Sequence, residues 1–261
     1  MTRLGVLGWP VAHSRSPAMQ NAALRAAGLE GWRYQRLPVP PEALAETVRA
    51  LPALGFRGAN VTIPHKRAVL ALAGAASPAA RAIGAANTLT FADGTIHADN
   101  TDAPALLRAL GEPLPSSALV LGAGGSARAV AYALRGAGVD VAVHNRTPAR
   151  AAALARDLGV RFVDAPDAAE LLVNCTPVGL GPDDGLPAGA EDPGAFACVV
   201  DLPYRDGGTA LAAAARAAGC RVVDGLELLV AQGALSFERW TGRPAPVAVM
   251  DAAARGPGAG S

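Results

Sequence analysis

The sequence predicts an α/β protein with two domains. Short apolar strands alternate with alanine-rich helical stretches, a pattern typical of mainly parallel sheets covered by helices. A glycine-rich turn at 122–127 falls between an expected strand and an expected helix, which indicates a dinucleotide-binding unit. The length of 261 residues and the hydrophobic content of 51% are enough for one or two domains with a large core.

In the first half of the chain, proline and glycine punctuate the expected elements. Serine followed by proline is a favourable start for a helix, and Asp-Gly between two alternating segments is typical of a hairpin turn. We expect strands at 4–7, 34–37 and 57–61, helices beginning at Ser16-Pro17, Pro41-Glu42 and Ser77-Pro78, and a hairpin of strands 88–92 and 95–98 turned by Asp93-Gly94.

The second half begins after the segment 114–117 with a βαβ unit. We expect its strands at 118–121 and 139–144, its helix at about 128–135, and further parallel strands at 171–174, 198–201 and 221–223. Helical patterns at 226–240 and 247–255 could return to the first half. We therefore predict one domain of residues 1–101 completed by 225–261, a Rossmann-type doubly wound domain of 102–224, and a cleft between the two. The tail 256–261 is expected to be disordered.

Composition excludes several classes of protein. With 23 basic and 22 acidic residues, the chain has no general attraction for nucleic acid or for an anionic membrane. The three cysteines are odd in number and widely spaced, so they indicate buried small side chains and no disulfide framework or metal site. The break at Gly8-Trp9-Pro10 and the lack of a later run of about 18 apolar residues predict a cytoplasmic protein.

The basic residues are distributed unusually, since 22 are arginine and only Lys66 is lysine. Asparagine is also rare. Where arginine and alanine are so strongly preferred, the positions that keep lysine or asparagine are the first candidates for function. The six asparagines are Asn21, Asn60, Asn87, Asn100, Asn145 and Asn174.

The glycine-rich turn has the pattern GxGxxA, formed by Gly122, Ala123, Gly124, Gly125, Ser126 and Ala127. Glycines at the start of such a turn let a pyrophosphate approach the amides at the helix N-terminus. A tight turn without a ligand is the competing interpretation. The strand before the turn and the helix after it favour a dinucleotide site.

The end of the next strand indicates which dinucleotide is bound. An NAD site usually has an acidic residue there, whereas this chain has Asn145, Arg146 and Thr147, followed by Arg150. A guanidinium binds a 2′-phosphate through charge-assisted hydrogen bonds, so NADP(H) is favoured over NAD. Arg150 could equally be a solvated helix charge.

Polar clusters occupy strand ends and loops of the first half. They are 13–17 (HSRSP), 60–66 (NVTIPHK), 84–88 (GAANT) and 100–102 (NTD). Together with 145–147 (NRT), 174–179 (NCTPVG), 201–204 (DLPY) and the stretch from Gly225 to Gly242, they resemble the shikimate dehydrogenase family. The resemblance runs from Gly8 to Gly242, nearly the whole chain, and is more specific than the dinucleotide motif.

The resemblance implies reversible reduction of 3-dehydroshikimate to shikimate by NADPH, in the chorismate route to aromatic amino acids. It implies that Lys66 and Asp102 are the catalytic pair. The substrate-binding residues that it implies are Ser14, Ser16, Thr62, Asn87, Tyr204 and Gln232. Thr176 and Gly225 are expected to be on the cofactor side, and Gly225 matches a backbone position near the nicotinamide. The expected partners are this small molecule and NADP(H), with no nucleic acid or membrane, in a monomer or homodimer.

The chemistry supports lysine at this position independently. Reduction of a ketone builds negative charge on its oxygen, and a positioned donor must supply a proton as that charge forms. Lysine can release a proton, whereas arginine stays protonated. A chain that uses arginine elsewhere but lysine at position 66 is consistent with that need.

Several residues have a structural alternative. Asp102 could be a helix N-cap, although Asn100 or Thr101 could take that place, and Ser16 could equally be a cap. Asn60 is expected to bond backbone rather than substrate. His13 and His65 have no partners at metal-ligand spacing, so structural roles are favoured.

Two other functions compete with this hypothesis. One is a quinate/shikimate dehydrogenase with broader substrate and cofactor use. The other is a catalytically silent NADP-binding protein, against which the presence of both Lys66 and Asp102 argues.

Overall fold

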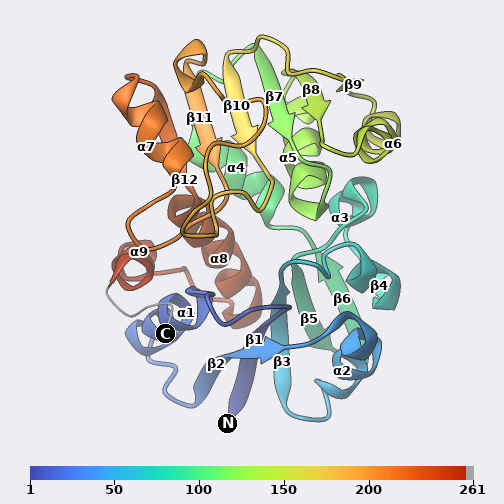
Figure 1. The fold of residues 1–261 in the computed structure, drawn as a ribbon. Helices are drawn as coiled ribbons and strands as arrows, with labels where there is room; N and C mark the ends of the chain where they lie inside the picture. The colour runs from blue at the N-terminus through green and yellow to red at the C-terminus, as the bar shows by residue number, and fades with distance from the viewer. Residues whose placement is uncertain (257–261) are drawn as a thin grey trace. The chain divides into compact units, whose positions relative to one another are not determined.

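The computed structural model describes residues 1–256 and divides into two compact units (Figure 1). Unit 1 comprises Met1–Ala105 and the chain from Leu229 onward, and unit 2 comprises Leu106–Leu228. The chain enters unit 2 within helix α4 (Asp102–Leu110) and leaves it within helix α8 (Gly225–Thr241). Within the described range, none of the helices combines the length and apolar content needed to cross a bilayer.

Unit 1 contains a six-stranded mixed sheet in the order β2-β1-β3-β5-β6-β4. Its strands are β1 (Thr2–Gly8), β2 (Trp32–Pro38), β3 (Phe56–Val61), β4 (Ala75–Ala76), β5 (Thr88–Ala92) and β6 (Thr95–Asp99). Strand β1 runs parallel to β2 and β3, whereas β5 is antiparallel to β3 and β6. The β5–β6 hairpin is confirmed, and Asp93 and Gly94 at its turn have positive φ angles of 51° and 70°.

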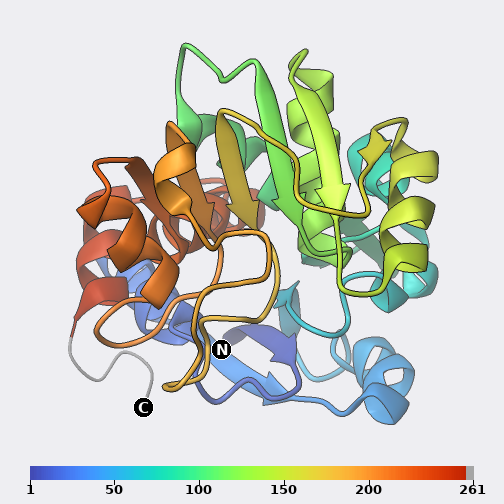
Figure 2. The same ribbon diagram turned by 45° about the horizontal axis from the view of Figure 1, so that its top comes forward.

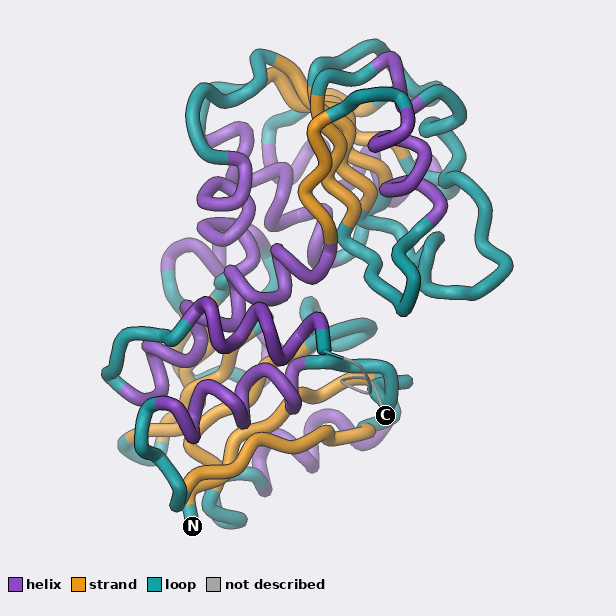
Figure 3. The backbone as a smooth tube through the Cα atoms, turned by 90° about the vertical axis from the view of Figure 1, so that its left-hand side faces the viewer, coloured by secondary structure: helices purple, strands orange, loops and turns teal. Residues whose placement is uncertain are grey.

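Helices cover both faces of this sheet. On one face, α1 (Ser16–Ala26), α8 and α9 (Val247–Arg255) pack around a core that includes Leu4, Met19 and Phe237 (Figure 3). The other face packs against 3₁₀ turn η1 (Pro41–Ala43), α2 (Leu44–Ala50) and 3₁₀ turn η2 (Ala68–Leu72). Helix α3 (Pro78–Ile83) precedes the hairpin, and the Ser77 side chain caps it as expected.

Trp240 anchors helix α8 to the sheet of unit 1. Its indole Nε1 donates a hydrogen bond of 2.9 Å to the carbonyl of Leu89, and its side chain is 2% exposed. A Cβ at Gly58 would lie 2.1 Å from that nitrogen, so only glycine permits this approach. The contact determines how α8 presents its other side chains to the sheet.

Unit 2 is a fully parallel six-stranded sheet in the order β12-β11-β10-β7-β8-β9 (Figure 2). Its strands are β7 (Ser117–Leu121), β8 (Asp140–His144), β9 (Arg161–Phe162), β10 (Leu171–Asn174), β11 (Cys198–Asp201) and β12 (Arg221–Asp224). Its helices are α5 (Gly125–Gly136), α6 (Pro148–Leu158), η3 (Pro193–Ala195) and α7 (Ala210–Ala217). The chain reverses direction across the sheet between β7 and β10, where doubly wound folds bind nucleotides.

The predicted elements are confirmed, with differences at their ends. Helix α5 begins at Gly125, three residues before the expected start. Glycine has a low helix propensity, so Gly125 is a weak signal for a helix start. The expected helix at Pro41 is a 3₁₀ turn continued by α2. Elements β4, β9, α6 and α7 were not predicted. Of the expected disordered tail, residues 257–261 lie outside the described residues.

Candidate active site

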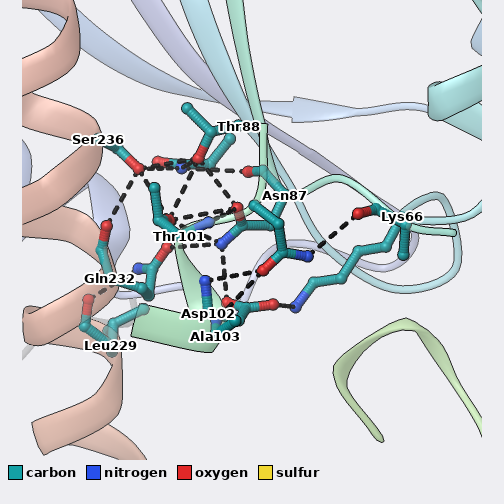
Figure 4. A network of polar contacts seen from close by, with 12 residues as sticks. Lys66, Asn87, Thr88, Thr101, Asp102, Ala103, Leu229, Gln232 and Ser236 are labelled. Atoms are coloured by element: carbon teal, nitrogen blue, oxygen red, sulfur yellow. Dashed lines mark hydrogen bonds and ion pairs between the residues drawn. The ribbon is translucent and has the colours of Figure 1, made fainter. Parts of the chain in front are cut away.

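Lys66 and Asp102 form an ion pair at the centre of the candidate site in unit 1 (Figure 4). Lys66 lies in the loop after β3, and Asp102 is the first residue of α4. The Lys66 Nζ and Asp102 Oδ2 atoms are 2.7 Å apart, and the two side chains are 14% and 18% exposed. Asp102 therefore orients the ammonium group, which keeps a small exposed fraction.

Asn87 links this pair to the helix α8. Its Nδ2 donates to Asp102 Oδ1 at 2.7 Å and to Gln232 Oε1 at 3.3 Å. Gln232 in turn donates from Nε2 to the carbonyl of Leu229 at 2.7 Å. Four of the residues implied by the resemblance thus come together from the β3 loop, the start of β5, α4 and α8.

A second layer of polar side chains lies behind Asn87, and the sequence did not reveal it. Asn87 Oδ1 accepts from the backbone N of Thr101 at 2.8 Å and from Thr88 Oγ1 at 3.0 Å. Ser236 Oγ lies 3.0 Å from Thr88 Oγ1 and accepts from Asn60 Nδ2 at 2.9 Å. Ser236 is one helical turn after Gln232, so helical spacing was the signal that could have identified it.

Asn60 therefore forms hydrogen bonds with side chains as well as with backbone. Besides Ser236, its Nδ2 donates to the carbonyl of Asn87 at 3.2 Å, and its Oδ1 accepts from the Tyr34 hydroxyl at 2.8 Å. The expectation that Asn60 bonds backbone is only partly correct, because the buried hydroxyls around it also need partners.

The cap of helix α4 is Asn100. Its Oδ1 accepts from the backbone nitrogens of Asp102 at 3.1 Å and Ala103 at 3.2 Å. The Asp102 carboxylate is consequently not the N-cap and is directed to Lys66 and Asn87.

Ser14 and Ser16 lie at the start of helix α1, each 4% exposed. Ser16 is the first helical residue, and Arg15 occupies the cap position without a capping hydrogen bond from its side chain. The interpretation of Ser16 as the cap is wrong, because the helix starts one residue earlier than a Ser16 cap requires. Ser14 Oγ instead accepts from the Ser16 backbone nitrogen at 3.3 Å. Thr62 follows β3, and its methyl Cγ2 would lie 2.5 Å from a Cβ at Gly8.

The two histidines near these segments differ in their surroundings. His65 is 1% exposed, and its Nε2 lies 2.7 Å from the carbonyl of Val39, which gives it a structural role. Partial burial and then the positive charge of Arg36 lower the pKa of His13. Within residues 1–256, no group of three or more His, Cys, Asp or Glu side chains is arranged to hold a metal ion.

In unit 2, the glycine-rich turn has room for a ligand. Gly122 has a φ of 111°, and a Cβ there would meet the backbone of Cys175 at 3.2 Å. A Cβ at Gly124, by contrast, would meet no heavy atom within 4 Å. Ala127, in the first turn of helix α5, is fully buried. This open turn at the N-terminus of the 12-residue helix α5 fits a pyrophosphate.

The loop after β8 lies next to this turn. The backbone nitrogen of Gly122 donates to the carbonyl of His144 at 2.8 Å, and Asn145 Nδ2 donates to the carbonyl of Thr147 at 3.0 Å. Arg146 and Arg150 are exposed, and no described residue forms a hydrogen bond or ion pair with either guanidinium. These cations fit a 2′-phosphate.

The loop after β10 rests on a buried polar group. Asn174 Oδ1 accepts from Thr176 Oγ1 at 2.7 Å, and Asn174 Nδ2 donates to Asp201 Oδ1 at 2.7 Å. The Thr209 hydroxyl donates to the other oxygen of Asp201. Burial raises the pKa of Asp201, although the bonds from Thr209 and Asn174 oppose that shift. Thr176 is thus held close to the glycine-rich turn, since the nitrogen of Cys175 donates to the carbonyl of Leu121 at 2.8 Å.

Two further predicted site residues, Gly225 and Tyr204, also belong to unit 2. Gly225 begins α8, where a Cβ would be 2.3 Å from the carbonyl oxygen of Leu202, so glycine is required by close approach. Tyr204 is half-buried in the loop after β11.

Known family models match most of the chain. Residues 6–89 match the shikimate dehydrogenase substrate binding domain, 108–176 match shikimate / quinate 5-dehydrogenase, and 225–255 match the shikimate 5′-dehydrogenase C-terminal domain. A shikimate dehydrogenase (NADP(+)) from Thermus thermophilus is 48% identical over 98% of both chains. The chain belongs to the shikimate dehydrogenase family.

Solved structures that are similar to this chain have the same fold. A shikimate 5-dehydrogenase from Thermus thermophilus in complex with NADP(H) and shikimate is 45% identical, with a TM-score of 0.87 over 98% of this chain and 99% of that one. A ligand-free 5-ketofructose reductase of Gluconobacter is 30% identical, with a TM-score of 0.83 over 97% of both chains. The predicted two-domain α/β fold with a Rossmann-type unit is confirmed.

Proposed function

We propose that the chain catalyses the reversible reduction of 3-dehydroshikimate to shikimate with NADPH, as a step toward chorismate and the aromatic amino acids. The observation that carries this proposal is the Lys66–Asp102 ion pair of 2.7 Å, bonded to Asn87, in a chain with no other lysine. The relatives named for NADP(+) and for shikimate support both the cofactor and the substrate.

Lys66 is the proton donor in this proposal. NADPH, when bound, supplies the hydride. As the ketone oxygen gains negative charge, Lys66 donates a proton from Nζ to it, and in the reverse direction Lys66 accepts the hydroxyl proton. Asp102 holds the ammonium in place through Oδ2 and is itself fixed by Asn87 at Oδ1. Because each carboxylate oxygen has a defined partner, the donor is positioned before the substrate arrives.

The substrate is bound by hydroxyl and amide groups. Asn87 and Gln232 lie next to Asp102 and are suited to the ring hydroxyls, with Thr62 and Tyr204 as further donors implied by the family resemblance. The substrate carboxylate should lie away from Asp102, because an ionised carboxylate only accepts hydrogen bonds and the Lys66 cation beside it is already paired. We place it at Ser14 and Ser16, where hydroxyls lie at the positive end of the 11-residue helix α1.

Unit 2 holds the cofactor in this proposal. The residues are Gly122, Ala123, Gly124, Gly125, Ser126, Ala127, Asn145, Arg146, Thr147, Arg150, Thr176 and Gly225. The open turn at Gly124 admits the pyrophosphate, and the exposed guanidiniums of Arg146 and Arg150 bind the 2′-phosphate. Residues 1–101 with 225–261 would form the substrate domain, and 102–224 the cofactor domain.

The proposal also includes a cytoplasmic location and an oligomeric state. No disulfide joins Cys175, Cys198 and Cys220, which suits the reducing cytoplasm. We expect a monomer or a homodimer with only small-molecule partners.

The deciding experiment is a spectrophotometric assay of purified protein with 3-dehydroshikimate and NADPH. Oxidation of NADPH that depends on 3-dehydroshikimate supports the proposal. Binding of NADPH without turnover would indicate a silent NADP-binding protein. The same assay in reverse, with shikimate and quinate and with NADP and NAD, distinguishes the broader quinate/shikimate enzyme.

A further inference from the structure

Arg36 reaches the Ser14 segment from strand β2. Its Nε and Nη2 donate to the carbonyl oxygen of Ser14 at 3.2 and 2.9 Å. Arg36 is half-buried on β2, opposite Val6 of β1, and the segment that it bonds is the connection from β1 to α1. One guanidinium therefore joins two elements that meet at the proposed carboxylate position.

The bonds of Arg36 hold the peptide group of Ser14, next to the side chain that carries the hydroxyl. Ser14 is 4% exposed, and its Oγ already accepts from the Ser16 backbone nitrogen at 3.3 Å. With the carbonyl held by Arg36 and Oγ held by Ser16, the hydroxyl hydrogen remains available to donate to a ligand. Because both the carbonyl oxygen and Oγ of Ser14 are held, the hydroxyl can donate to a ligand without further ordering of this residue on binding.

Arg36 also brings positive charge to this segment. The pKa of the neighbouring His13 is lowered by burial and by the charge of Arg36, so the guanidinium acts electrostatically on side chains beside Ser14. At the other part of the site, the positive charge of Lys66 is paired with the carboxylate of Asp102. A substrate with one carboxylate would thus be oriented with that group toward Arg36 and away from Asp102.

We infer that Arg36 is a positioning and specificity-determining residue, which fixes Ser14 and makes the site select substrates that carry a carboxylate. This inference rests on the proposed function, since it takes shikimate as the substrate. It concerns recognition and not the proton transfer, so its signature is a change in KM and in selectivity with kcat retained.

The test compares Arg36→Gln, Arg36→Lys and the matched control Arg33→Gln. Arg33 lies on the same strand and is exposed, and its replacement removes the same charge without touching Ser14. Each variant is assayed with shikimate and with its uncharged methyl ester, and its thermal unfolding is recorded. We expect Arg36→Gln to raise the KM for shikimate about tenfold, equivalent to about 1.4 kcal/mol, with kcat and the KM for NADP nearly unchanged.

The ester separates recognition of charge from a general structural effect. The KM for the ester should change much less than that for shikimate in Arg36→Gln, whereas Arg36→Lys should keep most of the preference for the acid. Equal losses for acid and ester, no change beyond that of Arg33→Gln, or an Arg36→Lys variant as impaired as Arg36→Gln would each overturn the inference.

The same proteins distinguish failure of the inference from failure of the proposed function. If the wild-type protein turns over shikimate, the kinetic comparison decides the role of Arg36. If it does not, the proposed function fails, and calorimetric titration of shikimate into wild type and Arg36→Gln tests Arg36 directly: tighter binding by the wild type supports the inference, and equal or undetectable binding overturns it.

Discussion

Replacing Lys66 by arginine would separate the charge of this side chain from its ability to release a proton. Arginine keeps a cation and several N–H donors facing Asp102, whose Oδ2 is 2.7 Å from the lysine Nζ, but it stays protonated in proteins. The substitution therefore preserves the electrostatics of the site more closely than alanine does. It removes the one step for which lysine is proposed.

The expected magnitude follows from that step. A positioned general acid contributes about 10²- to 10⁴-fold to a rate, which is equivalent to about 3–5 kcal/mol of barrier. The Lys66 side chain is 14% exposed, so water has limited access to replace it as the donor. We expect kcat of Lys66→Arg to fall within this range. Lys66→Ala should fall at least as far, because it also leaves the Asp102 carboxylate without its cation.

The assay is steady-state oxidation of NADPH by 3-dehydroshikimate, together with fluorescence titration of NADPH. Affinity for NADPH should be unchanged in both variants, since the proposed cofactor residues belong to unit 2 and Lys66 belongs to unit 1. Arg67→Ala is the matched control, because Arg67 is the adjacent cation, is exposed and has no side-chain cap bond. Turnover by Lys66→Arg within threefold of the control would refute the role of Lys66 as proton donor.

Three further predictions concern other parts of the chain. Arg146→Ala should raise the KM for NADP about tenfold and leave that for NAD nearly unchanged, because only NADP carries the 2′-phosphate; equal losses for both would contradict this. Asp201→Ala should lower the free energy of unfolding in urea by about 1–3 kcal/mol, since Asn174 and Thr209 lose a buried acceptor, and a loss below about 0.5 kcal/mol would show that they find other partners. Burial raises the pKa of Asp201 above 3.8, so the folded chain holds the proton more tightly, and the stability from this group is lost as pH rises through the folded pKa; the variant should lack that decline. Asn21→Ala should cost about 1–2 kcal/mol without changing kcat, since the Asn21 amide bonds both the N and the O of Tyr34 on edge strand β2; an unchanged unfolding midpoint would argue against this.

Local patterns in the sequence were sufficient for most secondary structure. Strands β10 and β11 and helix α9 have the expected bounds, and the Asp-Gly turn of the β5–β6 hairpin is present. These features depend on neighbouring residues, through side-chain alternation, helical spacing and the φ angles that glycine allows. Helix ends were less accurate. The starts of α1 and α5 depend on backbone bonds of the cap, which residue type alone does not specify.

Rarity drew attention to the asparagines but did not indicate their roles. All six asparagines form side-chain hydrogen bonds, yet their partners differ. Asn21 completes an edge strand, Asn100 caps α4, and Asn87 bonds Asp102. Composition treats these residues as equivalent, because it has no information about which donor or acceptor lies opposite each amide.

The sequence by itself determined the α/β class, the glycine-rich turn, the single lysine and the family. Tertiary structure alone decided that Lys66, Asn87, Asp102 and Gln232 meet and that Asn100 and not Asp102 caps the helix. It also decided that Ser236 bonds Thr88, which in turn bonds Asn87. The physical reason is the distance along the chain between the residues that interact. Turns and helices are selected by residues a few positions apart, whereas the site depends on strand order and on the packing of α8 through Trp240, which bring together side chains more than a hundred residues apart in the chain.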